Sequence, residues 1–251
     1  MRRLALGLLV GSVALGGCTD PVLEQRVADL EQKVTDLEKK MEAAPMRTAE
    51  RGAPSAASAS PEQEEAAAGI LRDANTLVTE MKYEEAKVKL AVLEKDYPTT
   101  RAARSSKRLI EELDVIGVDA GQLEVEKWYQ GNTTMSDGKA TLVVFWEVWC
   151  PHCRREVPAL EATYEKYKGE GLNVVAVTKI TKTATEEEVL AFVKENNLTY
   201  PMAKETGTLS ERFGVRGIPA AAVIKDGKVV WRGHPARLTD EMFKVWLGTT
   251  G

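Results

Sequence analysis

The sequence predicts an α/β fold with a mixed sheet flanked by helices, which a coiled coil and a small helical module precede. Residues 141–146 ("TLVVFW") and 172–178 ("LNVVAVT") are short, fully apolar runs, as expected for strands buried in the middle of a sheet. Helical patterns separate the strands, and this alternation indicates a partly parallel sheet. The stretch "AAAVIKDGKVVWRG" predicts two further strands joined at Asp226-Gly227, a dipeptide typical of type I′ hairpin turns.

The N-terminus has the pattern of an export signal. Arg2 and Arg3 precede the apolar run "LALGLLVGSVALGG", whose 14 residues before Cys18 are too few to span a bilayer comfortably. The ending "LGGC" resembles a bacterial lipobox, which implies that Cys18 is lipidated; the alternative is a plain signal peptide with a coincidental cysteine. We therefore interpret residues 1–18 as a lipoprotein signal peptide with its lipobox. The expected location is the cell envelope, with the chain anchored in a lipid bilayer through Cys18 and facing the periplasm, and the choice between inner and outer membrane stays open.

Residues 19–43 predict a coiled coil. Apolar residues recur there with alternating spacings of four and three, which is the heptad pattern of a coiled-coil seam. These residues are Leu23, Val27, Leu30, Val34, Leu37 and Met41. The pattern favours a homo-oligomer, and the alternative is one amphipathic helix docked on the rest of the chain. Residues 44–61 are rich in Ala, Ser and Pro without periodicity, so we expect a flexible linker.

Residues 62–117 predict a small helical module with two apolar stripes. The stripes are Ile70, Leu71, Ala74, Leu77, Val78 and Met81 in the first helix, and Ala86, Leu90, Leu93 and Tyr97 in the second. Pro98 ends the second helix, and Thr99 or Thr100 is expected to cap a third helix that carries Leu109, Ile110 and Leu113. The pattern resembles one and a half tetratricopeptide repeats, too few to form a solenoid alone.

The α/β domain is expected over residues 118–251. A helix opened by "CPHC" is predicted to run to about Lys168. Thr185 and Glu188 have capping-box spacing and predict another helix start. A last helix is expected over about residues 239–247.

Cys150 and Cys153 are the remaining two of three cysteines, and their C-x-x-C spacing lies where a strand ends and a helix starts. The helix N-terminus favours an anion there, so the Cys150 thiolate is expected to be the nucleophile. Pro151 fits the first helical position, where its missing N–H is not needed. A structural zinc ion needs four ligands, and the two thiols and two histidines of the chain do not form such a set because His152 lies between the thiols. We therefore expect no metal ion, and we expect no other bound cofactor because a thiol pair can pass electrons by disulfide exchange.

The charge balance excludes one class of partner. The formal net charge is −4, and no basic run exceeds two or three residues. Such a chain is not expected to bind nucleic acid.

Two segments carry a family resemblance. "FWEVWCPHC", with Pro158 five residues after the second cysteine, and "FGVRGIPAAAVIKDGKVV" resemble the thioredoxin superfamily. The pattern C-x-x-C-R-x-E-x-P resembles its TlpA/ResA-like, lipid-anchored branch. The resemblance covers about half of the chain, residues 118–251. It implies a thioredoxin-like fold in which Pro219 is cis and faces the cysteines.

The resemblance also implies roles for individual residues. Cys150 would attack a disulfide and Cys153 would resolve the intermediate, while Trp149 and Ile218 would flank a groove for an extended partner segment. Glu156 matches a glutamate that tunes proton transfer in this branch, although a solvated helix residue is an equal alternative.

One position departs from the superfamily. Val144 stands where many members have a buried carboxylate, six residues before the first cysteine. A local proton acceptor would then have to be Glu156 or Glu147, and Glu147 is alternatively just exposed at the strand end.

The sequence thus predicts a thiol–disulfide oxidoreductase that acts on disulfide-containing envelope proteins and exchanges electrons with a membrane thiol donor or acceptor. His152 gives the dipeptide of the oxidant DsbA, while the rest of the domain resembles reductases. We favour a reductase or exchanger, with a DsbA-like oxidase as the alternative. The alternative from another class is an envelope scaffold whose thioredoxin-like domain only recognises partners.

Overall fold

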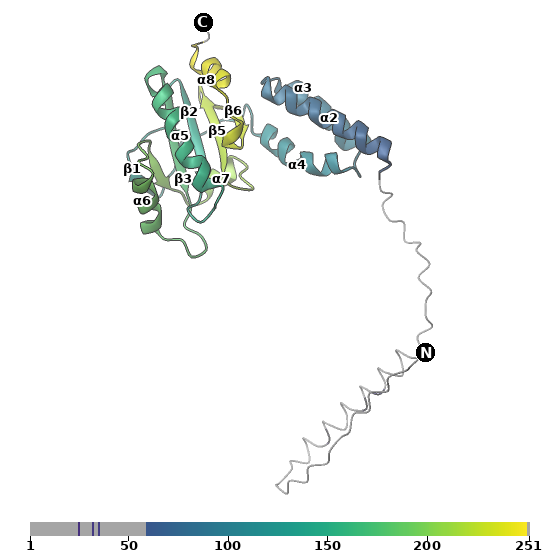
Figure 1. Cartoon of the computed structure of the whole chain (residues 1–251), viewed down its shortest axis with the longest axis horizontal. Coiled ribbons are helices and arrows are strands. Elements are labelled where there is room, and N and C mark those ends of the chain that lie inside the picture. The colour runs from purple at the N-terminus through teal and green to yellow at the C-terminus, as the bar shows by residue number, and fades with distance from the viewer. Residues whose placement is uncertain (1–24, 26–31, 33–34, 36–58, 250–251) are drawn as a thin grey trace. The chain divides into compact units, whose positions relative to one another are not determined.

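The computed structural model describes residues 25, 32, 35 and 59–249 (Figure 1). The chain divides into two compact units, residues 1–55 and 56–251. In the first unit, the described residues Gln25, Gln32 and Thr35 are helical and exposed. Cys18, the six apolar heptad positions and most of the expected linker lie outside the described residues.

Three helices open the second unit: α2 (Pro61–Thr79), α3 (Tyr83–Asp96) and α4 (Arg101–Asp114). Ser60 and Gln63 form a capping box at the start of α2, and the Thr100 side chain accepts the N–H of Ala103 at the start of α4. The expected cap at Thr100 is therefore confirmed. A shared apolar cluster holds the three helices together; it contains Ala67, Ala74, Val78, Ala86, Leu90, Leu93, Ala102, Ala103, Leu109 and Leu113.

A six-stranded mixed sheet follows, as the sequence predicts. Its strands are β1 (Lys127–Gln130), β2 (Ala140–Trp146), β3 (Leu172–Thr178), β4 (Met202–Lys204), β5 (Ala220–Lys225) and β6 (Lys228–Gly233), in the order β1-β4-β3-β2-β5-β6. Strands β2, β3 and β4 are parallel, whereas β5, β6 and β1 are antiparallel to their neighbours. All seven residues of β2 are buried, which places this strand in the middle of the core.

Two turn and cap predictions hold. Asp226 and Gly227 have φ angles of 51° and 75°, the positive values that a type I′ turn requires. Thr185 and Glu188 form the expected capping box at the start of α6 (Glu186–Glu195). The sequence patterns did not predict the short strands β1 and β4.

Helices cover both faces of the sheet. Alternate residues of β2 point to opposite faces, so Leu142 and Val144 belong to one cluster and Val143 and Phe145 to another. The first face packs against α5 (Cys153–Tyr167), α6 and α8 (Asp240–Leu247). The second packs against α7 (Thr208–Arg212), which the sequence patterns missed.

The segment that directly follows α4 pairs with strand β6. The N–H of Gly117 donates to the Val229 carbonyl at 2.8 Å, and Val229 returns a 3.0 Å bond to Val118. Asp119 forms an isolated antiparallel bridge with Lys228. These bonds fix the end of the helical module along β6. Within the described part of the chain, no helix is both long and apolar enough to cross a membrane.

Candidate active site

The two cysteines lie between the end of β2 and the start of α5. The N–H of Cys150 donates to the Glu147 carbonyl at 3.1 Å, and the Cys150 carbonyl accepts the N–H of Arg154 at 3.0 Å. α5 begins at Cys153 with His152 as its N-cap, so Pro151 precedes the helix and is not its first residue. The reason is that residues 151 and 152 form a turn before the regular helical bonds start.

Both thiols are free and buried, with 5% of Cys150 and 0% of Cys153 exposed. The Cys150 thiol donates a 3.8 Å hydrogen bond to the carbonyl oxygen of Ile218. The Ile218–Pro219 peptide bond is cis, as the sequence resemblance implies. The fold therefore brings Cys150, Ile218 and Pro219 together from segments that are far apart in the sequence.

The environment of Cys153 keeps its thiol protonated. Burial raises the pKa of Cys153 well above its ordinary value, and the nearby Cys150 and the Glu147 charge raise this pKa further. A backbone hydrogen bond from Glu147 acts in the opposite direction, but burial dominates. Cys153 is therefore held back as a neutral thiol behind Cys150.

Glu147 is a buried part of this site and is not exposed at the strand end. Only 6% of the residue is exposed. Its carboxylate accepts the Trp149 indole N–H at 2.6 Å and the hydroxyl of Thr181. These bonds hold the carboxylate beneath the surface, where its charge reaches Cys153. Val144, at the position of the missing carboxylate, is fully buried in β2.

Glu156 faces a different neighbour. It is half-buried on α5, one turn from Cys153, and its charge raises the pKa of His234 against a stronger lowering by burial. The carboxylate whose charge acts on Cys153 is that of Glu147.

His152 is exposed at the start of α5 and contacts a cation. Its Nδ1 atom lies 2.7 Å from Nη2 of Arg155. A guanidinium has no acceptor, so Nδ1 must accept this bond and the ring carries its proton on Nε2.

Trp149 forms the exposed edge of the site, with 37% of the residue exposed. Lys182 places its Nζ atom 3.0 Å from the centre of the Trp149 ring, a cation–π contact. A cavity of about 430 Å³ lies next to Trp149 and is lined also by Arg154, Glu188 and Phe192. The sequence patterns singled out Trp149 but neither Thr181 nor Lys182, which precede α6 in an irregular loop.

No three His, Cys, Asp or Glu side chains gather to hold a metal ion in the residues that the structure describes.

A paired C-x-x-C before a helix, a facing cis-proline and a sheet with this strand order define a thioredoxin-like domain. Residues 116–232 match the sequence model of the AhpC/TSA family. This segment is just under half of the chain, so the thioredoxin-like domain is similar to the AhpC/TSA family.

Named thiol–disulfide oxidoreductases are among its relatives. The chain is 26% identical over 110 residues to sporulation thiol-disulfide oxidoreductase A of Bacillus subtilis, covering 43% of this chain and 67% of the relative. It is 29% identical over 114 residues to thiol-disulfide oxidoreductase ResA of Halalkalibacterium halodurans, covering 44% and 62%. With ResA of Bacillus cereus the identity is 37% over 95 residues, covering 37% and 53%. The matches thus span between about half and two thirds of the relatives' own length.

Solved structures show similarity at a lower level. StoA from Bacillus subtilis has a TM-score of 0.43 and 23% identity, covering 51% of this chain and 96% of that chain. The thioredoxin domain of a thiol-disulfide oxidoreductase from Bacteroides vulgatus has a TM-score of 0.44 and 20% identity, covering 54% and 98%.

Proposed function

We propose that the chain is a thiol–disulfide oxidoreductase that reduces or exchanges disulfides of other proteins. One observation carries the proposal: the Cys150 thiol lies against the Ile218 carbonyl beside Pro219, with the buried Cys153 behind it. The names of its relatives support the same class of reaction.

The catalytic cycle consists of two exchanges. The Cys150 thiolate attacks one sulfur of a partner disulfide, a mixed disulfide forms, and the other partner sulfur leaves as a thiolate. Cys153 then loses its proton and attacks the Cys150 sulfur, which releases the second partner thiolate and forms the Cys150–Cys153 disulfide. Two electrons have passed to the partner, and protons from solution convert its thiolates to thiols. An external dithiol reverses these steps on the enzyme, so the cycle needs no bound cofactor.

The raised pKa of Cys153 fits this order of events. A protonated Cys153 does not compete with Cys150 for the incoming disulfide. Cys153 becomes a nucleophile when a base accepts its proton. We propose Glu147 as this base, because it is the carboxylate whose charge acts on the pKa of Cys153.

The contacts of His152 favour the reductase over the oxidase. A cationic or donating imidazole beside Cys150 would stabilise the thiolate and raise the reduction potential. Here the His152 ring contacts Arg155, and among the described residues no hydrogen bond joins the ring to the Cys150 thiol, which bonds to the Ile218 carbonyl. We expect a potential closer to that of thioredoxin, about −270 mV, than to that of DsbA, about −120 mV. Equilibration of the chain with glutathione buffers decides between these values.

The proposal is tested by reduction of insulin disulfides with dithiothreitol as the electron source. The full chain is expected to accelerate the reaction, and Cys150→Ser is expected to abolish the acceleration. An inactive wild-type chain that still binds partner proteins would favour the scaffold, in which the redox domain serves only recognition.

The setting of this activity is a second part of the proposal. The lipobox-like "LGGC" supports a lipid anchor at Cys18 on the periplasmic side, where disulfides persist. The partners there are disulfide-containing envelope proteins and a membrane thiol that donates or accepts electrons. Cys18→Ala should move the protein from the membrane fraction to the soluble fraction, and unchanged fractionation would contradict the anchor.

The heptad pattern of residues 19–43 supports self-association. A chain that starts at residue 19 should sediment as an oligomer, and one that starts at residue 62 should contain fewer subunits. If both sediment as monomers, the apolar seam packs within one chain.

A further inference from the structure

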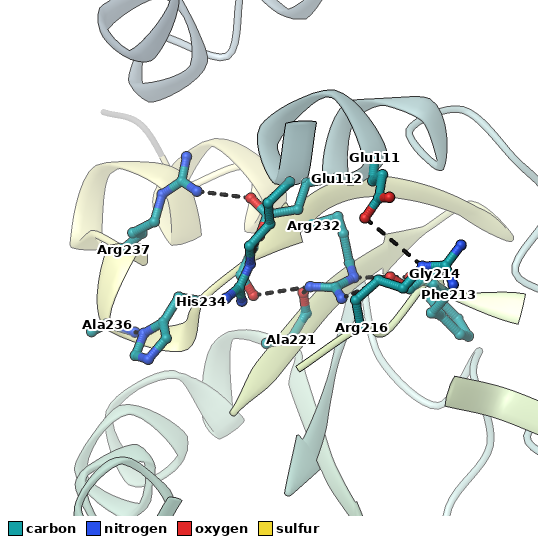
Figure 2. A network of polar contacts seen from close by, with 12 residues as sticks. Glu111, Glu112, Phe213, Gly214, Arg216, Ala221, Arg232, His234, Ala236 and Arg237 are labelled. Atoms are coloured by element: carbon teal, nitrogen blue, oxygen red, sulfur yellow. Dashed lines mark hydrogen bonds and ion pairs between the residues drawn. The ribbon is translucent and has the colours of Figure 1, made fainter. Parts of the chain in front are cut away.

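The end of α4 is tied to the redox domain by a network of Arg108, Glu112 and Arg237, here called the α4 network. Glu112 is buried, with 5% exposed. One of its carboxylate oxygens accepts Nε–H of Arg108 at 3.0 Å, and the other accepts Nη1–H of Arg237 at 2.9 Å. Figure 2 shows Arg237 reaching Glu112 from the short 3-10 helix Pro235–Arg237 that follows β6.

The α4 network places Arg108 beside the loop that contacts Cys150. A Cβ atom placed on Gly217 would lie 3.9 Å from Nη1 of Arg108. Gly217 directly precedes Ile218, whose carbonyl accepts from the Cys150 thiol. The guanidinium of Arg108 thus lies next to the segment that contacts the Cys150 thiol, at the edge of the groove that the family resemblance implies between Trp149 and Ile218.

Glu112 fixes the orientation of the Arg108 side chain, but part of the guanidinium's hydrogen-bonding capacity is unused. Its Nε atom is bound to Glu112, and its side chain is 53% exposed. Among the described residues, its two Nη groups have no hydrogen-bond partner. A guanidinium held at Nε presents its Nη donors as a preformed binding group, which costs less side-chain entropy on binding than a free arginine.

The groups around Arg108 carry more positive than negative charge. Arg216, Arg232 and Arg237 surround the carboxylates of Glu111 and Glu112 (Figure 2). Arg232 is buried and donates to backbone carbonyls, among them that of Phe213 at 2.9 Å. Among the described residues, no carboxylate contacts its guanidinium directly. Together with Arg108, four guanidiniums thus face two carboxylates.

The other titratable groups near this edge do not change the net positive charge around Arg108. His234 lies within range of Arg108, Arg237, His152 and Glu156, and burial lowers its pKa. Only Glu156 among these neighbours adds a negative charge. The edge of the groove therefore attracts anions.

We propose that Arg108 is a specificity residue that binds an acidic side chain next to the reactive cysteine of the partner. The proposal rests on the proposed function, because it names the substrate class of that same site: disulfide-bearing segments with an Asp or Glu beside the cysteine. The two Nη donors match the geometry of a carboxylate, which supports this ligand over a neutral amide. The helical module thereby contributes to substrate choice from outside the thioredoxin-like domain.

The test uses two peptide disulfides that differ only in Glu or Gln beside the cysteine. Reduction rates are measured for the full chain, Arg108→Gln, Arg108→Lys and the control Arg101→Gln. Arg101 is an exposed arginine at the opposite end of α4, paired with Glu64. The wild type should reduce the Glu peptide with a kcat/KM about two to five times that for the Gln peptide, the range for one exposed charge pair.

The variants distinguish an effect of the Arg108 charge on substrate binding from a general effect on the structure. Arg108→Gln should lose the preference through KM, with an unchanged rate on the Gln peptide. Arg108→Lys should keep only part of the preference, because an ammonium retains the charge but not the two Nη donors, and Arg101→Gln should keep all of it. The preference should also shrink as salt is added. Equal kcat/KM for both peptides in the wild type, or an unchanged preference in Arg108→Gln, would overturn the inference. Absence of activity on both peptides would instead contradict the proposed function, and the inference with it.

Discussion

The indole N–H of Trp149 donates a 2.6 Å hydrogen bond to the carboxylate of Glu147, which is buried beneath it. Trp149 is thereby linked to the acid whose charge raises the pKa of Cys153. The residue before the first cysteine therefore fixes the position of a carboxylate whose charge acts on Cys153.

The first prediction concerns this carboxylate. Glu147→Gln keeps an acceptor for Trp149 and Thr181 but removes the negative charge, so the pKa of Cys153 should fall. A decrease of about one unit corresponds to about 1.4 kcal/mol of differential stabilisation of the thiolate. The measurement is a titration of thiolate ultraviolet absorbance in a Cys150→Ser background, where only Cys153 contributes from the C-x-x-C pair.

Glu156→Gln is the matched control. It makes the same chemical change one helical turn from Cys153, but the charge of Glu156 acts on His234. Its titration curve should overlay that of the Glu156-containing parent. A larger shift in Glu156→Gln than in Glu147→Gln would assign the tuning carboxylate to Glu156 instead.

The positions of Glu147 and Glu156 in the structure show what sequence spacing can and cannot predict. Glu156 has the right helical spacing from Cys153, and Glu147 lies at the end of a strand where an exposed side chain is the ordinary expectation. Burial of Glu147 depends on Thr181, a residue from a loop 34 positions away. Patterns within one segment do not contain such contacts between distant segments.

The second prediction concerns the α4 network. Glu112→Gln removes a buried carboxylate that accepts from two guanidiniums, so the free energy of unfolding should fall by about 1–3 kcal/mol. Urea denaturation of the full chain measures this change. The neighbouring Glu111→Gln is the control, because its contact with Arg216 is 3.8 Å long and joins side chains that are 47% and 78% exposed. Its effect should be close to zero, and equal losses in both variants would show that the buried network is not what stabilises the junction.

The third prediction concerns a buried hydroxyl. Tyr83 packs against both the helical cluster and the main cluster of the sheet, and its hydroxyl has no hydrogen-bond partner among the described residues. Tyr83→Phe should therefore leave the free energy of unfolding unchanged or raise it by up to about 1 kcal/mol. By contrast, Tyr200→Phe removes a 2.8 Å bond to the Val157 carbonyl and should lower it by about 1–2 kcal/mol. Thermal unfolding of both variants checks the contrast, which would fail if Tyr83→Phe were as destabilising as Tyr200→Phe.

The raised pKa of Tyr83 should make the free energy of unfolding depend on pH. Burial raises the pKa of Tyr83 from 10.0 to about 12. The folded state therefore keeps a proton that the unfolded state loses first, so the contribution to stability is intact below pH 10 and is lost as the pH rises toward 12. The loss of stability between these pH values should be smaller in Tyr83→Phe than in the wild type. Parallel curves for the two proteins would contradict this assignment.

Much of the sheet was predictable because its strands are locally distinctive. β2 and β3 are continuous apolar runs, and the β5–β6 hairpin has its turn dipeptide. The strands β1 and β4 have only four and three residues and no alternating pattern, so they exist through pairing with each other and with β3. Cys150, Cys153 and Pro219 were predictable as a motif, whereas Arg108 was not, because only folding brings α4 beside Gly217.

The most direct test of the central claim is to trap the mixed disulfide. Cys153→Ser removes the resolving thiol, so attack by Cys150 on a protein disulfide should stop at a covalent adduct. Non-reducing electrophoresis and mass spectrometry should find this adduct linked through Cys150, and it should disappear on addition of dithiothreitol. Absence of an adduct in Cys153→Ser, or an equal adduct in Cys150→Ser, would contradict the assignment of Cys150 as the attacking thiol.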